Sequence, residues 1–227
     1  MKNIARLIKT NFPDYKKLSE EEFNRNFQVK WDKPMYQRND TFKTLKEDYS
    51  GKELKRQMII NLFREGKYYD GFLCAMVWGN MGTYRGGQNR FEGVFDVNKR
   101  DEISSKLEKV ITLLQEGKEE EAYRSLCDKT YNGIIGVGEA FFTKLLYFAG
   151  AGINTDLHPE PLIFDRNMRE VYYAIVKNTG EKKRGAKYFD YCYKMEELSK
   201  LLGLQTAGYV EALLFRQDIR DFLCNLK

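Results

Sequence analysis

Two glycines near the middle of the chain stand where a backbone can grip a phosphate. Gly136 and Gly138 flank Val137 between two helical patterns, the second of which begins at Glu139. Glycine lets the main chain approach an anion closely, and the amides of a helix N-terminus favour negative charge. The pattern indicates a hairpin that holds a nucleic-acid backbone without reading its sequence. An ordinary turn capped by the same glycines is the other interpretation, because Gly-x-Gly alone is a weak signal.

A single acidic residue follows an apolar run farther along the chain. The run 161–164 leads to Asp165, and a helical pattern begins directly afterwards at Arg166. The helix dipole stabilises a carboxylate at this position, so Asp165 is expected to stay ionised. Most aspartates at such positions only cap their helix, and the sequence leaves both roles open.

The elements that must position these residues are predicted to be helices. Apolar residues recur at helical spacing in eight segments: 53–64, 69–78, 103–114, 122–127, 139–149, 166–177, 190–202 and 207–223. Alternating strand patterns are scarce, so we expect an all-α fold. Residues 1–50 are interpreted as an N-terminal arm with one short helix near 19–27, for which Ser19 and Glu22 have capping-box spacing. The arm is expected to pack on a helical domain formed by residues 51–227.

Composition narrows the class of protein. The 227 residues carry a net charge of +5, a mild excess that is compatible with a polyanionic partner. The four cysteines stand far apart and His158 is the single histidine, so neither a metal site nor another cofactor is expected. The N-terminus shows no signal-peptide pattern and no segment is long and apolar enough to span a membrane, which predicts a cytoplasmic protein.

The order of hairpin, helix, apolar run, aspartate and helix resembles the helix-hairpin-helix DNA glycosylase superfamily. Residues 136–150 (GVGEAFFTKLLYFAG) and 163–168 (IFDRNM) look like bacterial proteins of the 8-oxoguanine glycosylase fold. The resemblance is fainter at 75–79 (AMVWG) and 210–215 (VEALLF), and it covers roughly residues 70 to 215. It implies two packed helical lobes with a cleft between them.

The resemblance implies that Lys144 and Asp165 are the catalytic residues. In the best-known lyase members the lysine follows the hairpin glycine by about two residues, whereas that position here is Ala140. Positions 140 and 144 lie one helical turn apart on the same face, so Lys144 is expected to point into the same cleft. A lysine whose stem lies along an apolar helix is the other interpretation.

The chemistry that follows is cleavage of the bond between a base and its sugar. Asp165 would stabilise positive charge on the sugar and help to deprotonate a nucleophile. If Lys144 attacks C1′, a Schiff base forms and β-elimination nicks the strand, whereas attack by water leaves an intact abasic site. The lysine therefore decides between a bifunctional glycosylase/AP lyase and a simple glycosylase.

The DNA partner implied by the resemblance is a duplex that contains a damaged or modified base, bound by a monomer. The target base must leave the duplex and enter a pocket, for which Trp78, Phe141 and Phe142 are candidates, although aromatics at helical spacing are more often core. Besides the hairpin residues Gly136, Val137 and Gly138, the expected DNA contacts are Tyr84 and Arg85 in a glycine-rich loop, and Arg166. A solvated loop without a DNA contact is the other interpretation of the glycine-rich segment.

Which base is removed stays open between an 8-oxoguanine-like lesion, as in DNA repair, and a hypermodified phage base, as in phage defence. Two further classes of function also stay open. A non-catalytic helix-hairpin-helix module would bind DNA without releasing a base, and a helical protein-interaction scaffold would show no salt-sensitive DNA binding.

Overall fold

The computed structural model describes residues 1–26, 29, 31, 35–38, 40–80, 93–95, 98–127, 133–153, 156–180 and 187–226. In this part of the chain the regular secondary structure is helical and contains no β-strand, as the sequence predicts. The chain divides into two compact units. Unit 1 combines the two ends of the chain, residues 1–25 and 156–227, and unit 2 comprises residues 26–155.

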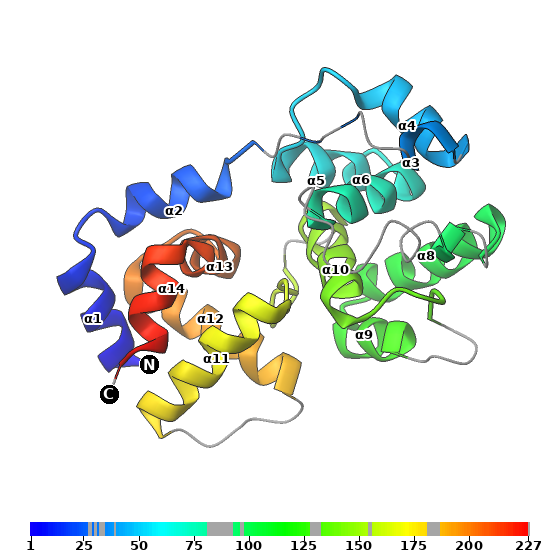
Figure 1. The fold of residues 1–227 in the computed structure, drawn as a ribbon. Coiled ribbons are helices and arrows are strands. Elements are labelled where there is room, and N and C mark those ends of the chain that lie inside the picture. Colours follow the sequence, from blue (N-terminus) through cyan, green and yellow to red (C-terminus); the bar gives the residue numbers. More distant parts are fainter. Residues whose placement is uncertain are drawn as a thin grey trace. The chain divides into compact units, whose positions relative to one another are not determined.

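Unit 2 is built around one apolar helix (Figure 1). α10 (Glu139–Ile153) contacts α5, α6, α8 and α9, and residues 142–150 are all buried, because this helix is apolar on nearly every side. Among the described residues of the unit, the helices with bounds at both ends are α3 (Met35–Arg38), α4 (Asp40–Tyr49), α5 (Arg56–Arg64), α6 (Tyr68–Asn80), α8 (Arg100–Gln115), α9 (Glu119–Cys127) and α10.

Close approach of α10 to α5 depends on Gly152. A Cβ atom at this position would lie 2.7 Å from the carbonyl oxygen of Ile60 and 2.8 Å from the Cβ atom of Phe63. The absence of a side chain therefore brings the two backbones together and fixes the depth at which α10 is buried.

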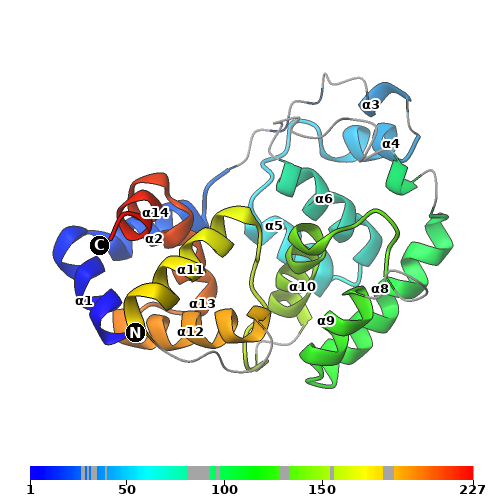
Figure 2. The ribbon, with the colours of Figure 1, turned by 60° about the horizontal axis from the view of Figure 1, so that its bottom comes forward.

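Unit 1 surrounds a second apolar helix. α13 contacts α2, α11, α12 and α14, while α1 packs against α11 and α12 (Figure 2). The elements are α1 (Lys2–Asn11), α2 (Tyr15–Phe23), α11 (Arg166–Thr179), α12 (Lys187–Leu202), α13 (Ala207–Phe215) and α14 (Gln217–Cys224). The N-terminal helices therefore complete a core whose other helices come from the C-terminal part of the chain.

Several expected elements differ from the structure. Residues 1–50 are divided between the two units, and the segment 207–223 forms two helices separated by Arg216, whose backbone is extended. The predicted helix near 19–27 is wrong in its bounds, since α2 ends at Phe23, and Ser19 is not its N-cap. Ser19 is buried within α2 and donates a hydrogen bond of 2.6 Å to the Tyr209 carbonyl of α13. The Ser19 hydroxyl therefore forms a tertiary contact instead of the helix cap that the local pattern predicts.

None of the helices in the described part of the chain has the length and apolar character needed to cross a membrane. The cleft expected between the two lobes stays a prediction.

Candidate functional site

The hairpin before α10 is a tight turn. Within it, the Val137 amide donates to the Ile134 carbonyl at 3.0 Å, and the Gly138 carbonyl accepts hydrogen bonds from Phe141 at 2.8 Å and from Phe142 at 3.0 Å. Gly138 thus stands at the N-terminal end of α10, where first-turn amide groups have no acceptor in a preceding helical turn. This arrangement provides the backbone donors that bind anions.

The structure gives a reason for glycine at one of the two hairpin positions but not at the other. Gly136 has a φ angle of +85°, and a Cβ atom there would lie 3.0 Å from Cγ2 of Val94, so the turn itself favours glycine. Gly138 is exposed, and a Cβ atom there would meet no atom within 4 Å. The packing of the protein therefore leaves room for a side chain at Gly138.

Asn98 is a residue at this hairpin that the sequence analysis missed. Its side chain is 3% exposed, and its amide nitrogen donates to the Val94 carbonyl at 2.5 Å and to the Ile135 carbonyl at 2.9 Å. Its amide oxygen accepts from the Ile135 backbone nitrogen at 3.2 Å. Lys106 also donates to the Gly133 carbonyl at 2.7 Å. These contacts fix the hairpin backbone, and no sequence signal distinguishes Asn98 from other polar residues.

Lys144 lies in the buried part of α10, with an exposed fraction of 5%. Its Nζ donates a hydrogen bond of 2.8 Å to the Ala140 carbonyl one turn earlier, so the side chain runs back toward the hairpin end of the helix. The amine lies 5.6 Å from the centre of the Phe141 ring. On the other side, a Cβ atom at Gly79 of α6 would be only 2.6 Å from Cδ of Lys144. Gly79 therefore leaves the space that the lysine stem occupies.

The three aromatic residues expected to form a base pocket occupy different environments. Trp78 is 3% exposed and packs edge-on against Phe148, with ring centroids 5.2 Å apart. Phe142 is also buried and contacts Tyr123 edge-on at 5.4 Å. Phe141 is only partly buried and lies beside the Lys144 amine. Trp78 and Phe142 thus belong to the core of unit 2, and only Phe141 retains an accessible surface.

Trp78 also takes part in a cation–π cluster inside unit 2. The guanidinium of Arg56, whose exposed fraction is 1%, lies 5.0 Å from the Trp78 ring centre and 5.2 Å from that of Tyr147. A desolvated cation–π contact of this kind contributes about 2 kcal/mol. The cluster connects α5 with α6 and α10, the two helices that carry Gly79 and Lys144.

Asp165 is the N-cap of α11 in unit 1. Its backbone is extended, and its Oδ1 accepts a hydrogen bond of 3.2 Å from the Met168 amide. The side chain is partly exposed. Capping satisfies one helix amide but leaves the carboxylate charge in place, so this geometry is compatible with both roles considered from the sequence.

The apolar run before Asp165 is held by side chains from distant helices. The backbone amide of Leu162 donates to the Tyr188 hydroxyl at 3.1 Å, and the amide of Ile163 donates to Oε2 of the fully buried Glu211 at 3.1 Å. These side chains supply hydrogen bonds of the kind that a neighbouring strand would provide in a sheet. Glu211 was missed from the sequence, where the only signal is one glutamate within the apolar pattern of α13.

Glu160 ties the start of the same run to α13. Its Oε2 accepts a hydrogen bond of 2.9 Å from the Ala207 amide at the N-terminus of that helix. Burial is the main cause that raises the pKa of Glu160 to about 7, and the nearby Glu211 adds to it, while hydrogen bonds from the helix N-terminus act in the opposite direction. The segment that delivers Asp165 is therefore anchored through a carboxyl group that titrates near neutral pH.

Comparison with family models gives a match over residues 20–215 to the family described as "Putative 8-oxoguanine DNA glycosylase OGG-like protein". The chain belongs to this family. No significant match was found among curated proteins or among solved structures.

The remaining expected DNA contacts of this OGG-like protein are placed only in part. Tyr84 and Arg85 lie outside the described residues. Arg166 is described: its side chain is 84% exposed and pairs with Glu170 at 3.0 Å, one turn along α11. Arg166 follows Asp165 directly in the sequence, and its exposed side chain is accessible to a binding partner.

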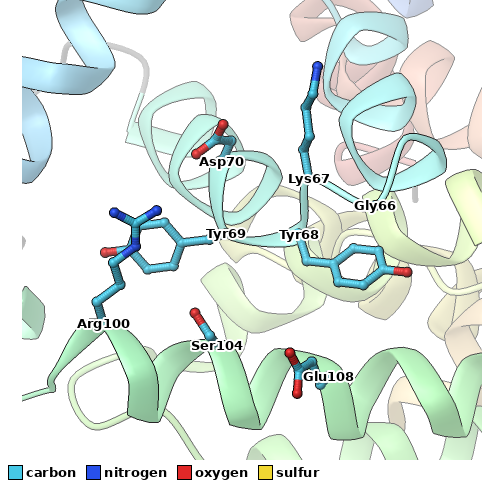
Figure 3. A pocket seen from close by; sticks show the side chains of 8 residues that line it. All are labelled: Gly66, Lys67, Tyr68, Tyr69, Asp70, Arg100, Ser104 and Glu108. Atoms are coloured by element: carbon cyan, nitrogen blue, oxygen red, sulfur yellow. The ribbon is translucent and has the colours of Figure 1, made fainter.

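Unit 2 of the OGG-like protein also contains a pocket away from the expected site residues (Figure 3). This cavity of about 270 Å³ lies between the N-terminal end of α6 and α8. The Arg100 guanidinium lies against the Tyr69 ring, 4.7 Å from its centre. The cavity is lined by Gly66, Lys67, Tyr68, Tyr69, Asp70, Arg100, Ser104 and Glu108. It includes neither Lys144 nor any of the three expected pocket aromatics.

Proposed function

We propose that this protein is a DNA glycosylase that removes a damaged or modified base from double-stranded DNA. The observation that carries the proposal is the Lys144 amine, which is buried in α10 and held on the Ala140 carbonyl at 2.8 Å. In the best-known lyase members of the similar superfamily, the lysine stands at the position that Ala140 occupies here. Because the side chain runs back by one turn, Lys144 brings an amine to the same level of the helix.

Lys144 is proposed as the nucleophile. Its neutral amine would attack C1′ while the bond from C1′ to the base breaks, and the base would leave with the bonding electron pair and take up a proton. Opening of the sugar ring then gives a Schiff base. Removal of a C2′ proton from that intermediate expels the 3′ phosphate and nicks the strand. The burial of the amine supports this role, because desolvation favours the neutral amine that the attack requires.

Asp165 is proposed to stabilise the positive charge that develops on the sugar as the base departs. The anchored run 161–164 supports this role, since a catalytic carboxylate is effective only when its position is fixed before the reaction. The hydrogen bonds from Leu162 to Tyr188 and from Ile163 to Glu211 fix that run.

The hairpin amides next to Gly138 are proposed to bind a phosphate of the DNA strand. The open space at Gly138 supports this assignment, because the fold itself does not require glycine there, whereas a closely approaching phosphate does. Phe141 is proposed to contact the extruded base, with Trp78 and Phe142 supporting it from the core. Arg166 is proposed as a further phosphate contact.

A non-catalytic DNA-binding module is the second candidate, and the cap at Asp165 favours it. The hydrogen bond from Met168 accounts for an aspartate at this position without any chemistry. The two candidates differ in a single measurable property, the release of a base.

The test is a panel of duplexes that carry 8-oxoguanine, other lesions or hypermodified bases, each incubated with the protein and then treated with alkali to reveal abasic sites. We expect cleavage at one class of modified base, and borohydride should trap a covalent adduct that Lys144→Gln abolishes. Asp165→Asn keeps a capping oxygen and should bind DNA normally while releasing no base. Asp14→Asn, at the N-cap of α2, is the matched control and should retain activity.

Three results would change the assignment. Duplex binding without release of any base supports the non-catalytic module. Base release without trapping assigns the attack to water and returns Lys144 to a binding or structural role. Wild-type turnover by Asp165→Asn removes that residue from the mechanism.

A further inference from the structure

The exposed side of α11 carries cations and one aromatic ring in a narrow stripe. Arg166, Tyr173 and Lys177 are separated by seven and four residues, so they lie on the same side of the helix. Arg166 and Lys177 are exposed, and Tyr173 is one of the large hydrophobic residues that the fold leaves open, with an exposed fraction of 49%. The stripe begins directly after Asp165.

A fourth residue joins the stripe from the next helix. Lys187, the first residue of α12, donates a hydrogen bond to the Tyr173 hydroxyl, and its Nζ lies 4.3 Å from the centre of the Tyr173 ring. We call Arg166, Tyr173, Lys177 and Lys187 the α11 stripe. α11 is yellow and the start of α12 is orange in Figure 2.

A second residue besides Lys187 holds the Tyr173 ring in place. It contacts the ring of the buried Tyr172, with centroids 5.5 Å apart, and the Tyr172 hydroxyl donates to Asp190 at 2.7 Å. Asp190 in turn accepts a hydrogen bond from Lys194 at 3.2 Å, and all three side chains are buried. An exposed ring that is already held in one position loses little conformational entropy when a partner packs against it.

The charge of this surface is positive. Glu170 is the acidic residue of α11, and it is paired with Arg166 at 3.0 Å, which leaves Lys177 and Lys187 in excess. Asp190, in the first turn of α12, contributes no negative charge at the surface because it is fully buried and paired with Lys194. Cations beside an exposed aromatic ring can bind a strand of a duplex, because the cations contact phosphates and the ring packs against a sugar.

We propose that the α11 stripe is a second DNA-contact surface, which holds the strand on one side of the nucleotide from which the base is removed. The proposal rests on the proposed function, because it places the target nucleotide at Asp165. Tyr173 lies roughly 12 Å along the helix from Asp165, at a rise of about 1.5 Å per residue. Each strand of a duplex carries one phosphate per about 3.4 Å of helix axis, so the stripe reaches phosphates a few nucleotides from the target.

The test measures the salt dependence of binding to a fluorescein-labelled duplex of ordinary bases, by fluorescence anisotropy of the full-length protein. Lys177→Ala combined with Lys187→Ala should weaken binding about tenfold and reduce the slope of log affinity against log salt by about 2. The matched control combines Lys17→Ala with Lys200→Ala, which removes the same charge from α2 and α12 of the same unit. This control should bind like the wild type.

The aromatic contact is tested separately. Tyr173→Ala should weaken binding severalfold, while Tyr173→Phe keeps the ring and should bind nearly as well as the wild type. Thermal unfolding followed by circular dichroism checks that each variant keeps its fold.

The outcomes separate this inference from the proposed function. Base release by the wild type together with unchanged affinity of the stripe variants overturns the inference alone. Equal weakening by both double variants also overturns it, since bulk charge then explains the effect. Selective weakening without base release by the wild type supports the stripe and contradicts the glycosylase assignment, and failure of the wild type to bind any duplex overturns both.

Discussion

At the scale of single residues, the position of the Lys144 side chain depends on a glycine that lies beside it. The lysine stem runs along Gly79 of α6 before its amine reaches the Ala140 carbonyl. The contact with Ala140 is local to α10, whereas the contact with Gly79 joins segments that lie far apart in the sequence. The position of the proposed nucleophile is thus decided jointly by its own helix and by a glycine on a neighbouring one.

We predict that Gly79→Ala displaces the Lys144 amine without unfolding unit 2. The added Cβ atom would lie 2.6 Å from Cδ and 2.9 Å from Cε of Lys144, and these atoms belong to a flexible side chain that can move more cheaply than backbone. Alanine is also favoured over glycine within a helix by about 1 kcal/mol. Borohydride trapping should fall by about tenfold or more, in line with the sensitivity of catalysis to misplacement by about 1 Å.

Duplex affinity and thermal unfolding of the same variant provide the control measurements, and both should stay close to wild type. Wild-type trapping by a folded Gly79→Ala protein would show that the amine does not act from the position seen next to Gly79.

At the scale of elements, one glycine of the hairpin–α10 segment is needed for packing, and another is proposed to serve DNA binding. Gly152 lies where α10 meets α5, and Gly138 lies exposed at the other end of the helix. The first is required by packing within the protein. The second has open space around the position of a side chain, so its proposed role concerns a partner.

We predict opposite effects for alanine at these positions. Gly152→Ala should lower the free energy of unfolding by about 1–3 kcal/mol, because its Cβ atom would lie 2.7 Å from the Ile60 carbonyl and the helices must separate. Gly138→Ala should leave that free energy almost unchanged and weaken duplex binding about tenfold through obstructed phosphate approach. Urea unfolding and fluorescence anisotropy measure the two quantities. Unchanged duplex affinity of Gly138→Ala would contradict the assignment of the hairpin.

At the scale of the whole molecule, the carboxyl group of Glu160 makes stability depend on pH. This residue connects the segment before Asp165 to the N-terminus of α13, and burial raises its pKa from 4.5 to about 7. A raised carboxyl pKa means that the folded state binds the proton more tightly than the unfolded state. The stabilisation is therefore complete below pH 4.5 and is lost as pH rises to about 7.

We predict that the wild-type free energy of unfolding decreases between pH 5 and pH 8, by up to about 3 kcal/mol from this group. Glu160→Gln removes the titration and retains an acceptor for the Ala207 amide, so the pH dependence should become nearly flat over that range. Unfolding should be followed by circular dichroism, because both tryptophans, Trp31 and Trp78, belong to unit 2 and do not report on unit 1. A variant with the same slope as the wild type would assign the titration to another group.

The sequence by itself determined the helical class and the starts of the two helices nearest the proposed chemistry. α10 begins at Glu139 after the hairpin glycines, and α11 begins at Arg166 after Asp165, because turn glycines and N-cap residues act on the few residues beside them. Family membership confirms the resemblance carried by these same segments. The catalytic roles of Lys144 and Asp165 stay predictions.

Only the tertiary structure decided which residues meet across long separations in the chain. Ser19 bonds to Tyr209 instead of capping a helix, Asn98 fixes the backbone at Ile135, and Glu211 receives the Ile163 amide. The burial of Trp78 against Phe148 follows from the same rule. Helical periodicity reports which face of a segment is apolar, but it does not specify the distant segment that covers this face. Partners of that kind are selected by packing and by the requirement that buried polar groups form hydrogen bonds, and both act through space.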